Sequence, residues 1–93
     1  MPLKQSYTRR QGITEREIDD VIFLVNPDTD ALYHLNPVGA ALWRLLKDRT
    51  NGKEAADLIC KAFPDADPTT VKTDIVKLMA EFFDHQLITI AEE

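Results

Sequence analysis

A predicted strand leads directly into a predicted helix at Ala31-Leu32-Tyr33-His34-Leu35-Asn36-Pro37-Val38-Gly39-Ala40-Ala41-Leu42-Trp43. Asn36 suits the position that caps a helix N-terminus, and Pro37 needs no amide donor at the first helical position. The spacing predicts a helix from Pro37 to about residue 47, with its core-facing stripe formed by Val38, Ala41, Leu42 and Leu45. This junction divides the chain into a strand-rich first part and a helical second part.

Two strands are predicted before the junction. Residues 13–18 alternate weakly and predict a largely exposed strand, whereas Val21–Val25 is a β-branched and aromatic run typical of a strand that is buried on both faces. Asp19-Asp20 and residues 26–30 have the composition of turns. The two strands and residues 31–35 therefore predict an antiparallel sheet of three strands.

Two further helices are predicted after the junction. Asn51 and Glu54 have the spacing of a capping box, and Pro64 ends the helix that follows them. Asp67-Pro68 opens a third helix that runs to about His85. Its core stripe is formed by Val71, Ile75, Leu78 and Phe82, and three more apolar residues widen the stripe, namely Val76, Met79 and Phe83. Residues 87–90 predict a terminal strand or an extended tail.

The order of these elements predicts one domain of the α+β class. An N-terminal three-stranded antiparallel sheet, three helices and a short C-terminal strand are the elements of a winged helix-turn-helix, and a small α+β sandwich is the alternative. Residues 1–10 are polar without periodicity and predict a flexible basic arm, which leaves residues 11–93 for the folded domain.

Composition limits the function. A chain of 93 residues with one cysteine forms one domain without an internal disulfide, which favours a cytoplasmic location. No segment has the length and apolar character of a membrane span or a signal peptide, so no membrane partner is expected. The net charge is −5, although Lys4, Arg9 and Arg10 make the first ten residues basic. An acidic body disfavours nucleic acid as a partner.

The residues that carry catalytic or metal chemistry are sparse. His34, His85 and Cys60 show no metal-ligand spacing, and no phosphate-binding glycine loop is present in the sequence. Cys60 falls inside the second predicted helix, where an inert thiol is expected. We therefore expect neither an enzyme nor a cofactor or metal site.

The junction resembles the PqqD family. Members carry the pattern Y-x-L-N-x-[ST]-G-A-x-[IL]-W, and the residues that match it are Tyr33, Leu35, Asn36, Gly39, Ala40, Leu42 and Trp43. Val38 replaces the usual small hydroxyl residue. Lys53–Ile59 and Val71–Ile75 resemble the helices of the family, and Gln86 stands where the family prefers glycine. The resemblance extends over roughly residues 12–90.

The resemblance implies a non-catalytic peptide chaperone. Such domains bind the leader of a ribosomally made precursor peptide and present it to a modifying enzyme, which in pyrroloquinoline quinone (PQQ) biosynthesis is a radical S-adenosylmethionine protein. In the family the leader adds as a strand beside the third strand and lies in a cleft against the third helix. Here these elements correspond to residues 31–35 and 68–85.

This resemblance suggests a peptide site that the wide third-helix stripe could line. Tyr33 and Leu35 are expected to face the core, which leaves Leu32 and His34 outward. The predicted peptide-binding residues are Ala31, Leu32, Tyr33, His34, Leu35, Lys72, Val76, Met79 and Phe83. Alternatively, the extra stripe packs against the sheet or against a second copy, because an exposed edge strand could also pair in a homodimer.

DNA binding by a winged helix, or another protein-interaction module, is the competing function. The third helix of a DNA reader is usually basic. Here its two bases, Lys72 and Lys77, are outnumbered by acids, namely Asp67, Asp74, Glu81 and Asp84. One basic cluster elsewhere is either a solvated face or a dock for an acidic partner, and its members are Arg44, Lys47, Arg49 and Lys53.

Overall fold

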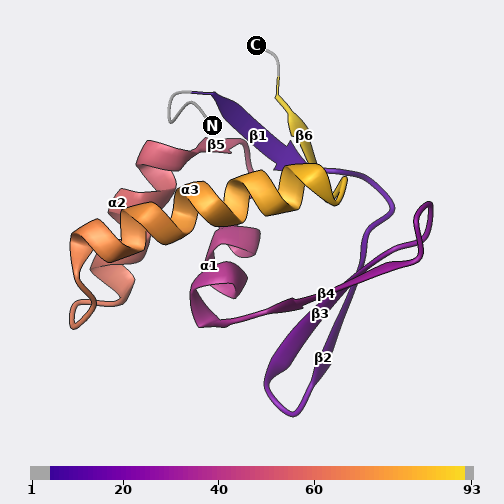
Figure 1. Cartoon of the computed structure of the whole chain (residues 1–93), viewed down its shortest axis with the longest axis horizontal. Coiled ribbons are helices and arrows are strands. Elements are labelled where there is room, and N and C mark those ends of the chain that lie inside the picture. The colour runs from indigo at the N-terminus through magenta and orange to yellow at the C-terminus, as the bar shows by residue number, and fades with distance from the viewer. Residues whose placement is uncertain (1–4, 92–93) are drawn as a thin grey trace.

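The computed structural model describes residues 5–91 and consists of two small sheets and three helices (Figure 1). The strands are β1 (Ser6–Arg9), β2 (Thr14–Ile18), β3 (Val21–Asn26), β4 (Ala31–Leu35), β5 (Thr50–Asn51) and β6 (Ile88–Ile90). The helices are α1 (Pro37–Leu45), α2 (Gly52–Ala62) and α3 (Pro68–Asp84). The predicted α+β class is confirmed, although the likeness to a winged helix is loose, because the last strand pairs with the first rather than forming a hairpin wing.

The predicted N-terminal sheet is an antiparallel meander of order β2-β3-β4. Its register aligns Glu15, Leu24 and Tyr33 across the three strands. The inward side chains of β3 and β4 are buried, with Ile22 7%, Leu24 0% and Leu35 4% exposed. The expectation that Val21–Val25 is buried on both faces is wrong: alternate residues of β3 are buried, and the others remain half-buried.

The second sheet, of order β5-β1-β6, joins segments that are distant in sequence. It corrects the expectation of a flexible arm over residues 1–10, because Ser6–Arg9 is a strand paired on both sides; residues 1–4 lie outside the described part of the chain. Tyr7 is 3% exposed within the core. The Arg9 guanidinium donates to the Trp43 carbonyl at 2.9 and 2.7 Å and lies 4.4 Å from the centre of the Trp43 ring.

The helices begin where the capping signals predict. The Asn36 side chain accepts from the Gly39 amide at 2.6 Å, and the Asn51 side chain accepts from the Glu54 amide at 2.8 Å. Asp67 precedes α3 without capping a backbone amide; its carboxylate accepts from the Thr70 hydroxyl instead. Helices α1 and α3 end at Leu45 and Asp84, slightly before the predicted residues 47 and 85.

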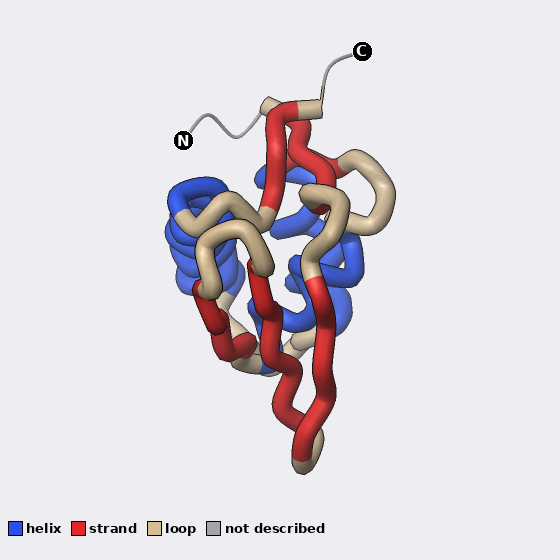
Figure 2. The backbone as a smooth tube through the Cα atoms, turned by 90° about the vertical axis from the view of Figure 1, so that its right-hand side faces the viewer, coloured by secondary structure: helices blue, strands red, loops and turns tan. Residues whose placement is uncertain are grey.

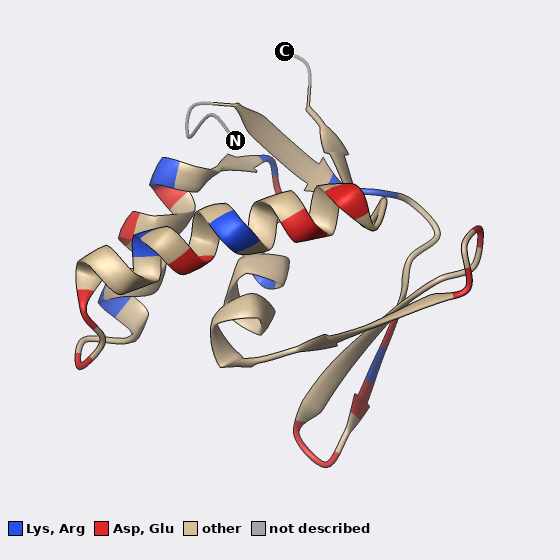
Figure 3. Ribbon diagram, viewed as in Figure 1, with Lys and Arg blue, Asp and Glu red and all other residues tan. Residues whose placement is uncertain are grey.

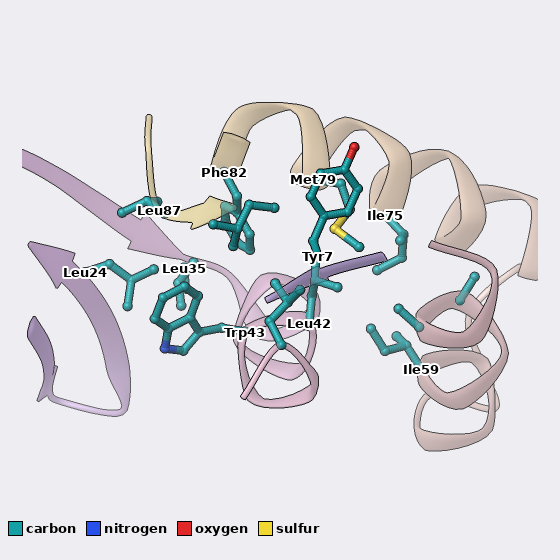
Figure 4. Packing of buried hydrophobic residues seen from close by; sticks show 14 of the residues in the cluster. Tyr7, Leu24, Leu35, Leu42, Trp43, Ile59, Ile75, Met79, Phe82 and Leu87 are labelled. Atoms are coloured by element: carbon teal, nitrogen blue, oxygen red, sulfur yellow. The ribbon is translucent and has the colours of Figure 1, made fainter. Parts of the chain in front are cut away.

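The core lies between α3, α1, α2 and the inner faces of both sheets (Figure 4). On α1 the buried side is centred on Leu42 and Trp43 and continues to Leu46 just after the helix, whereas Val38, Ala41 and Leu45 of the predicted stripe are half-buried. Ile75, Met79 and Phe82 of α3 enter the same cluster. This packing holds α3 across the middle of the molecule, where one of its sides comes next to β4.

Candidate peptide-binding groove

Strand β4 forms one edge of its sheet. Within residues 5–91 it pairs with β3 alone, so the other side of its backbone carries amide and carbonyl groups that no strand partner uses. Its side chains alternate as predicted: Leu35 is buried and Tyr33 half-buried on the inner side, whereas Leu32 and His34 are exposed on the outer side. A backbone edge of this kind can accept an additional strand.

Tyr33 connects this edge strand to α3. Its hydroxyl donates to the Glu81 carboxylate, and its ring packs edge-on against Phe82 at 5.5 Å between ring centres. The His85 ring lies 5.3 Å from the Tyr33 ring. Burial, together with the hydrogen bond and negative charge of Glu81, raises the pKa of Tyr33 above its ordinary value of 10.0. Tyr33 is therefore a neutral donor at physiological pH and fixes the distance between β4 and α3.

A groove of about 400 Å³ lies between β4 and α3, and we call it the β4–α3 groove. Its residues come from β4, from the start of α1 and from successive turns of α3, namely Tyr33, His34, Asn36, Asp74, Lys77, Leu78 and Glu81. Leu78 is the apolar side chain that α3 contributes, and it stands among the charges of Asp74, Lys77 and Glu81. The groove therefore offers one apolar contact surrounded by polar and charged groups.

Gly39 allows α1 and α3 to approach closely beneath this groove. A Cβ atom at Gly39 would lie 3.1 Å from the Asn36 Oδ1 atom and 3.7 Å from the Leu78 side chain. The absence of a side chain at this position, predicted to reflect the approach of a neighbouring element, thus leaves room for the Asn36 cap and for Leu78. The conformation of the groove floor depends on the same strand-to-helix junction that marks the sequence.

Most of the chain matches the sequence model of a known protein family. A family model described as coenzyme PQQ synthesis protein D (PqqD) matches residues 22–88, which include the junction, β4 and all of α3. The chain belongs to the PqqD family. No curated protein sequence matches it.

Solved structures share the fold of this PqqD-family chain at low sequence identity. TbiB1, solved in complex with the TbiA(beta) leader peptide, is 23% identical with a TM-score of 0.76, over 92% of this chain and 99% of that chain. The PqqD truncation of Methylobacterium extorquens PqqCD, described as a stand-alone recognition element for ribosomally synthesized and post-translationally modified peptides (RiPPs), is 18% identical with a TM-score of 0.75, over 95% and 93%. Lasso peptide synthetase B1, complexed with the leader peptide, is 17% identical with a TM-score of 0.73, over 89% and 96%.

The α3 residues predicted to line a groove with β4 lie elsewhere in this PqqD-family chain. Met79 is 2% exposed and belongs to the core. Phe83 is 40% exposed and contacts the Tyr7 ring at 5.9 Å, beside β1 and β6 rather than β4. Val76 and Lys72 lie about two and three turns before Phe83 along that side of α3, half-buried and exposed respectively.

The physical reason for this correction is helical phase. Residues 81 and 83 differ by about 200° around a helix, so the β4 side and the β1 side of α3 are nearly opposite. An apolar stripe identifies the buried side of a helix but does not say which of its two borders faces a particular strand. The sequence signal for the border that faces β4 was Leu78, which has Asp74, Lys77 and Glu81 around it on the helix surface. A second signal was the Tyr33 hydroxyl, which required an acceptor.

The Asn26 side chain connects the C-terminal end of α3 to the sheet through two hydrogen bonds. Its side chain is 1% exposed, and its Nδ2 group donates to the carbonyls of His85 at 3.3 Å and Gln86 at 3.1 Å. Gln86 has φ +58°, the left-handed conformation that favours the glycine of the PqqD pattern. The turn nevertheless forms: the Leu87 amide donates to the Phe82 carbonyl at 2.9 Å. Asn26 thus places the His85 end of α3 beside the β3–β4 hairpin.

Groups for metal binding or covalent catalysis do not converge at the groove. Among residues 5–91, no set of three or more His, Cys, Asp and Glu side chains is placed to hold a metal ion. Cys60 is a half-buried free thiol on α2 that packs against the core. None of the helices described could span a membrane. The groove can hold a ligand through backbone hydrogen bonds, one apolar contact and charges.

Proposed function

We propose that this chain is a non-catalytic recognition element that binds the leader of a ribosomal precursor peptide and presents it to a modifying enzyme. The observation that carries the proposal is the unpaired backbone edge of β4 beside the β4–α3 groove. Family membership and the leader complexes of TbiB1 and lasso peptide synthetase B1 support it. The precursor peptide belongs to PQQ biosynthesis or to the biosynthesis of another modified peptide. A radical S-adenosylmethionine protein is one candidate for the modifying enzyme.

Strand addition is the binding mode that fits this geometry. A leader segment antiparallel or parallel to Ala31–Leu35 would hydrogen-bond to the β4 backbone, which provides affinity that is independent of its side chains. Alternate leader side chains would enter the groove, where an apolar one meets Leu78 and a polar one meets Asp74, Lys77 or Glu81. The proposed contacts replace Lys72, Val76, Met79 and Phe83 as the α3 part of the site.

The acidic character of α3 disfavours the alternative of DNA binding. Asp74 and Glu81 line the groove side, Asp84 lies at the C-terminal end, and acidic residues recur along the helix in Figure 3. Phosphate groups would be repelled at this surface. A peptide strand carries no obligatory charge and can be accepted.

A matched pair of variants on α3 tests the proposal. The probe is a labelled candidate leader, taken from the short reading frames that neighbour this chain's gene, and its affinity is measured by fluorescence anisotropy. Leu78→Glu places a charge in the groove and is expected to weaken binding at least about tenfold, since desolvating an unpaired carboxylate is costly. Phe83→Glu, on the opposite side of α3, is expected to bind like the unmodified chain.

Two results would overturn this assignment. If the unmodified chain does not bind that leader, leader recognition is wrong for this chain. If Phe83→Glu loses affinity and Leu78→Glu retains it, while circular dichroism shows both variants folded, the peptide lies on the β1 side of α3.

A further inference from the structure

The face of the β2-β3-β4 sheet that points away from the core carries apolar side chains that are exposed or half-buried. We call the set formed by Ile18, Val21, Phe23, Val25 and Leu32 the outer face. Ile18 and Leu32 are 57% and 66% exposed, the highest values among the large apolar side chains described. Val21, Phe23 and Val25 are half-buried yet do not pack against the core cluster. Figure 2 looks onto this sheet, with the helices behind it.

Strand register places these side chains on one face around the exposed Arg16, which lies opposite Phe23. Ile18 lies opposite Val21, and Val25 lies opposite Leu32. Between these pairs Phe23 packs against the His34 ring at 5.6 Å. Exposed apolar side chains gathered on one sheet face, with polar residues among and around them, are typical of an interaction surface. The β3 sequence, which is apolar on both sides, has the pattern of a strand that is covered on both faces.

Acidic turns border the patch at both ends. Asp19 and Asp20 form the β2–β3 turn, and Asp30 lies in the β3–β4 turn beside Asp28, which is paired with Arg10 (Figure 3). Strand β3 has six residues, so the two turns are roughly 20 Å apart. A complementary surface has an apolar strip of that length with a basic residue at each end.

A second copy of the chain does not have this complementarity. If two outer faces packed with aligned strands, a two-fold axis in the interface would place each acidic turn against an acidic turn of the other copy, whether the strands ran parallel or antiparallel. The net charge of −5 adds to this repulsion. The acidic ends therefore favour a different protein with a basic border.

We infer that the outer face docks the peptide-modifying enzyme through an apolar strip flanked by Lys or Arg. The identity of this partner rests on the proposed function. The surface is separate from the α3 wall of the β4–α3 groove, so enzyme and leader can be held together. A leader strand beside β4 would extend the sheet, and its outward side chains would continue the patch beyond Leu32.

Two sets of variants test the apolar and the acidic parts of this surface. Ile18→Thr with Val25→Thr removes apolar contact while keeping β-branched residues suited to strands. Asp19→Asn, Asp20→Asn and Asp30→Asn together remove charge at three positions with positive φ, a conformation that Asn tolerates. Ile90→Thr, at an exposed position of β6, is the control for the loss of an apolar side chain elsewhere.

The probe is a purified candidate modifying enzyme, taken from the genes that neighbour this chain's gene, and binding is measured by biolayer interferometry with and without leader. The Thr pair is expected to weaken enzyme binding at least about tenfold, as loss of central interface contacts does. The Asn triple is expected to weaken it and to reduce its dependence on salt. Ile90→Thr should bind normally, and leader affinity should be unchanged in every variant.

Several results would overturn the inference. Enzyme binding that is absent in the unmodified chain, or unaffected by the Thr pair, would do so. So would a dimer of the chain alone in sedimentation that the Thr pair dissociates, because a second copy would then cover the outer face. Failure of leader binding with normal enzyme binding would instead reject the proposed function and leave the docking surface supported.

Discussion

The hydrogen bonds between Asn26 and the end of α3 predict a large loss of stability from a very small chemical change. Asn26→Asp replaces the amide nitrogen by oxygen at a side chain that is 1% exposed. The variant can still accept from the Asp28 amide, which lies 3.0 Å from the Asn26 Oδ1 atom. It loses both donors to the His85 and Gln86 carbonyls and brings a carboxylate against the negative end of the α3 dipole.

The magnitude follows from burial. A buried charge without a partner costs about 3–5 kcal/mol, and each carbonyl left without a donor costs about 1–3 kcal/mol. These terms overlap, so we expect the free energy of unfolding to fall by about 3–5 kcal/mol at pH 7, against a typical total of about 5–15 kcal/mol. Burial raises the folded-state pKa of the new carboxyl group above its unfolded value. The loss should therefore be smallest at low pH and should grow as pH rises through the folded-state pKa.

Urea denaturation between pH 4 and 8 measures this effect, and Asn51→Asp provides the control. Asn51 undergoes the same chemical change at the N-terminus of α2, where its side chain accepts from the Glu54 amide. A carboxylate there keeps that bond and faces the positive end of the helix dipole, so stability should stay the same or rise by a few tenths of a kcal/mol. A loss below about 1 kcal/mol for Asn26→Asp, or equal losses for both variants, would refute the reasoning.

Three further predictions concern α3 and its neighbours. Gln86→Gly should raise the free energy of unfolding by about 0.5–1 kcal/mol in urea denaturation, because glycine adopts a positive φ without strain; an unchanged or lower value would argue against strain at this turn. Met79→Glu should unfold the chain or destabilise it by about 4 kcal/mol or more, whereas Phe83→Glu should keep the circular dichroism spectrum, and a folded Met79→Glu protein would remove Met79 from the core. Tyr33→Phe should lower the free energy of unfolding by about 1 kcal/mol through loss of the hydrogen bond to Glu81. Above pH 10 the stability of this variant should fall less steeply than that of the unmodified chain, because the raised pKa of Tyr33 stabilises the fold below pH 10 and that contribution is lost as the hydroxyl ionises at higher pH. Identical slopes of stability against pH would contradict this role of Tyr33.

Local signals in the sequence predicted the elements well, because the interactions that produce them are local. The Asn36 and Asn51 caps act within one helical turn, and the alternation of residues 31–35 determines which side chains of β4 face inward. Strand β1 was missed for the opposite reason. It is short and mostly polar, Tyr7 is its one buried residue, and its partners are near residues 50 and 88–90.

The residues that line the β4–α3 groove were predicted only in part, for a related physical reason. The edge strand follows from the order of the elements, but the side of α3 that faces it depends on how the helix is rotated in the core. Met79 turned inward and Leu78 turned toward β4, although both are apolar and adjacent in sequence. The outer face was also not predicted, since an apolar run such as Val21–Val25 indicates a strand suited to burial without saying what provides the second cover.

Backbone NMR during a leader titration tests the central claim most directly. With uniformly ¹⁵N-labelled chain and the same candidate leader, we expect amide shift changes, and slower hydrogen exchange, in Ala31–Leu35, with further shifts around Asp74, Leu78 and Glu81. Strand β2, the opposite edge of the same sheet, serves as the internal control and should not change. Changes confined to β2, or to the β1 and β6 side of α3 around Phe83, would contradict the account.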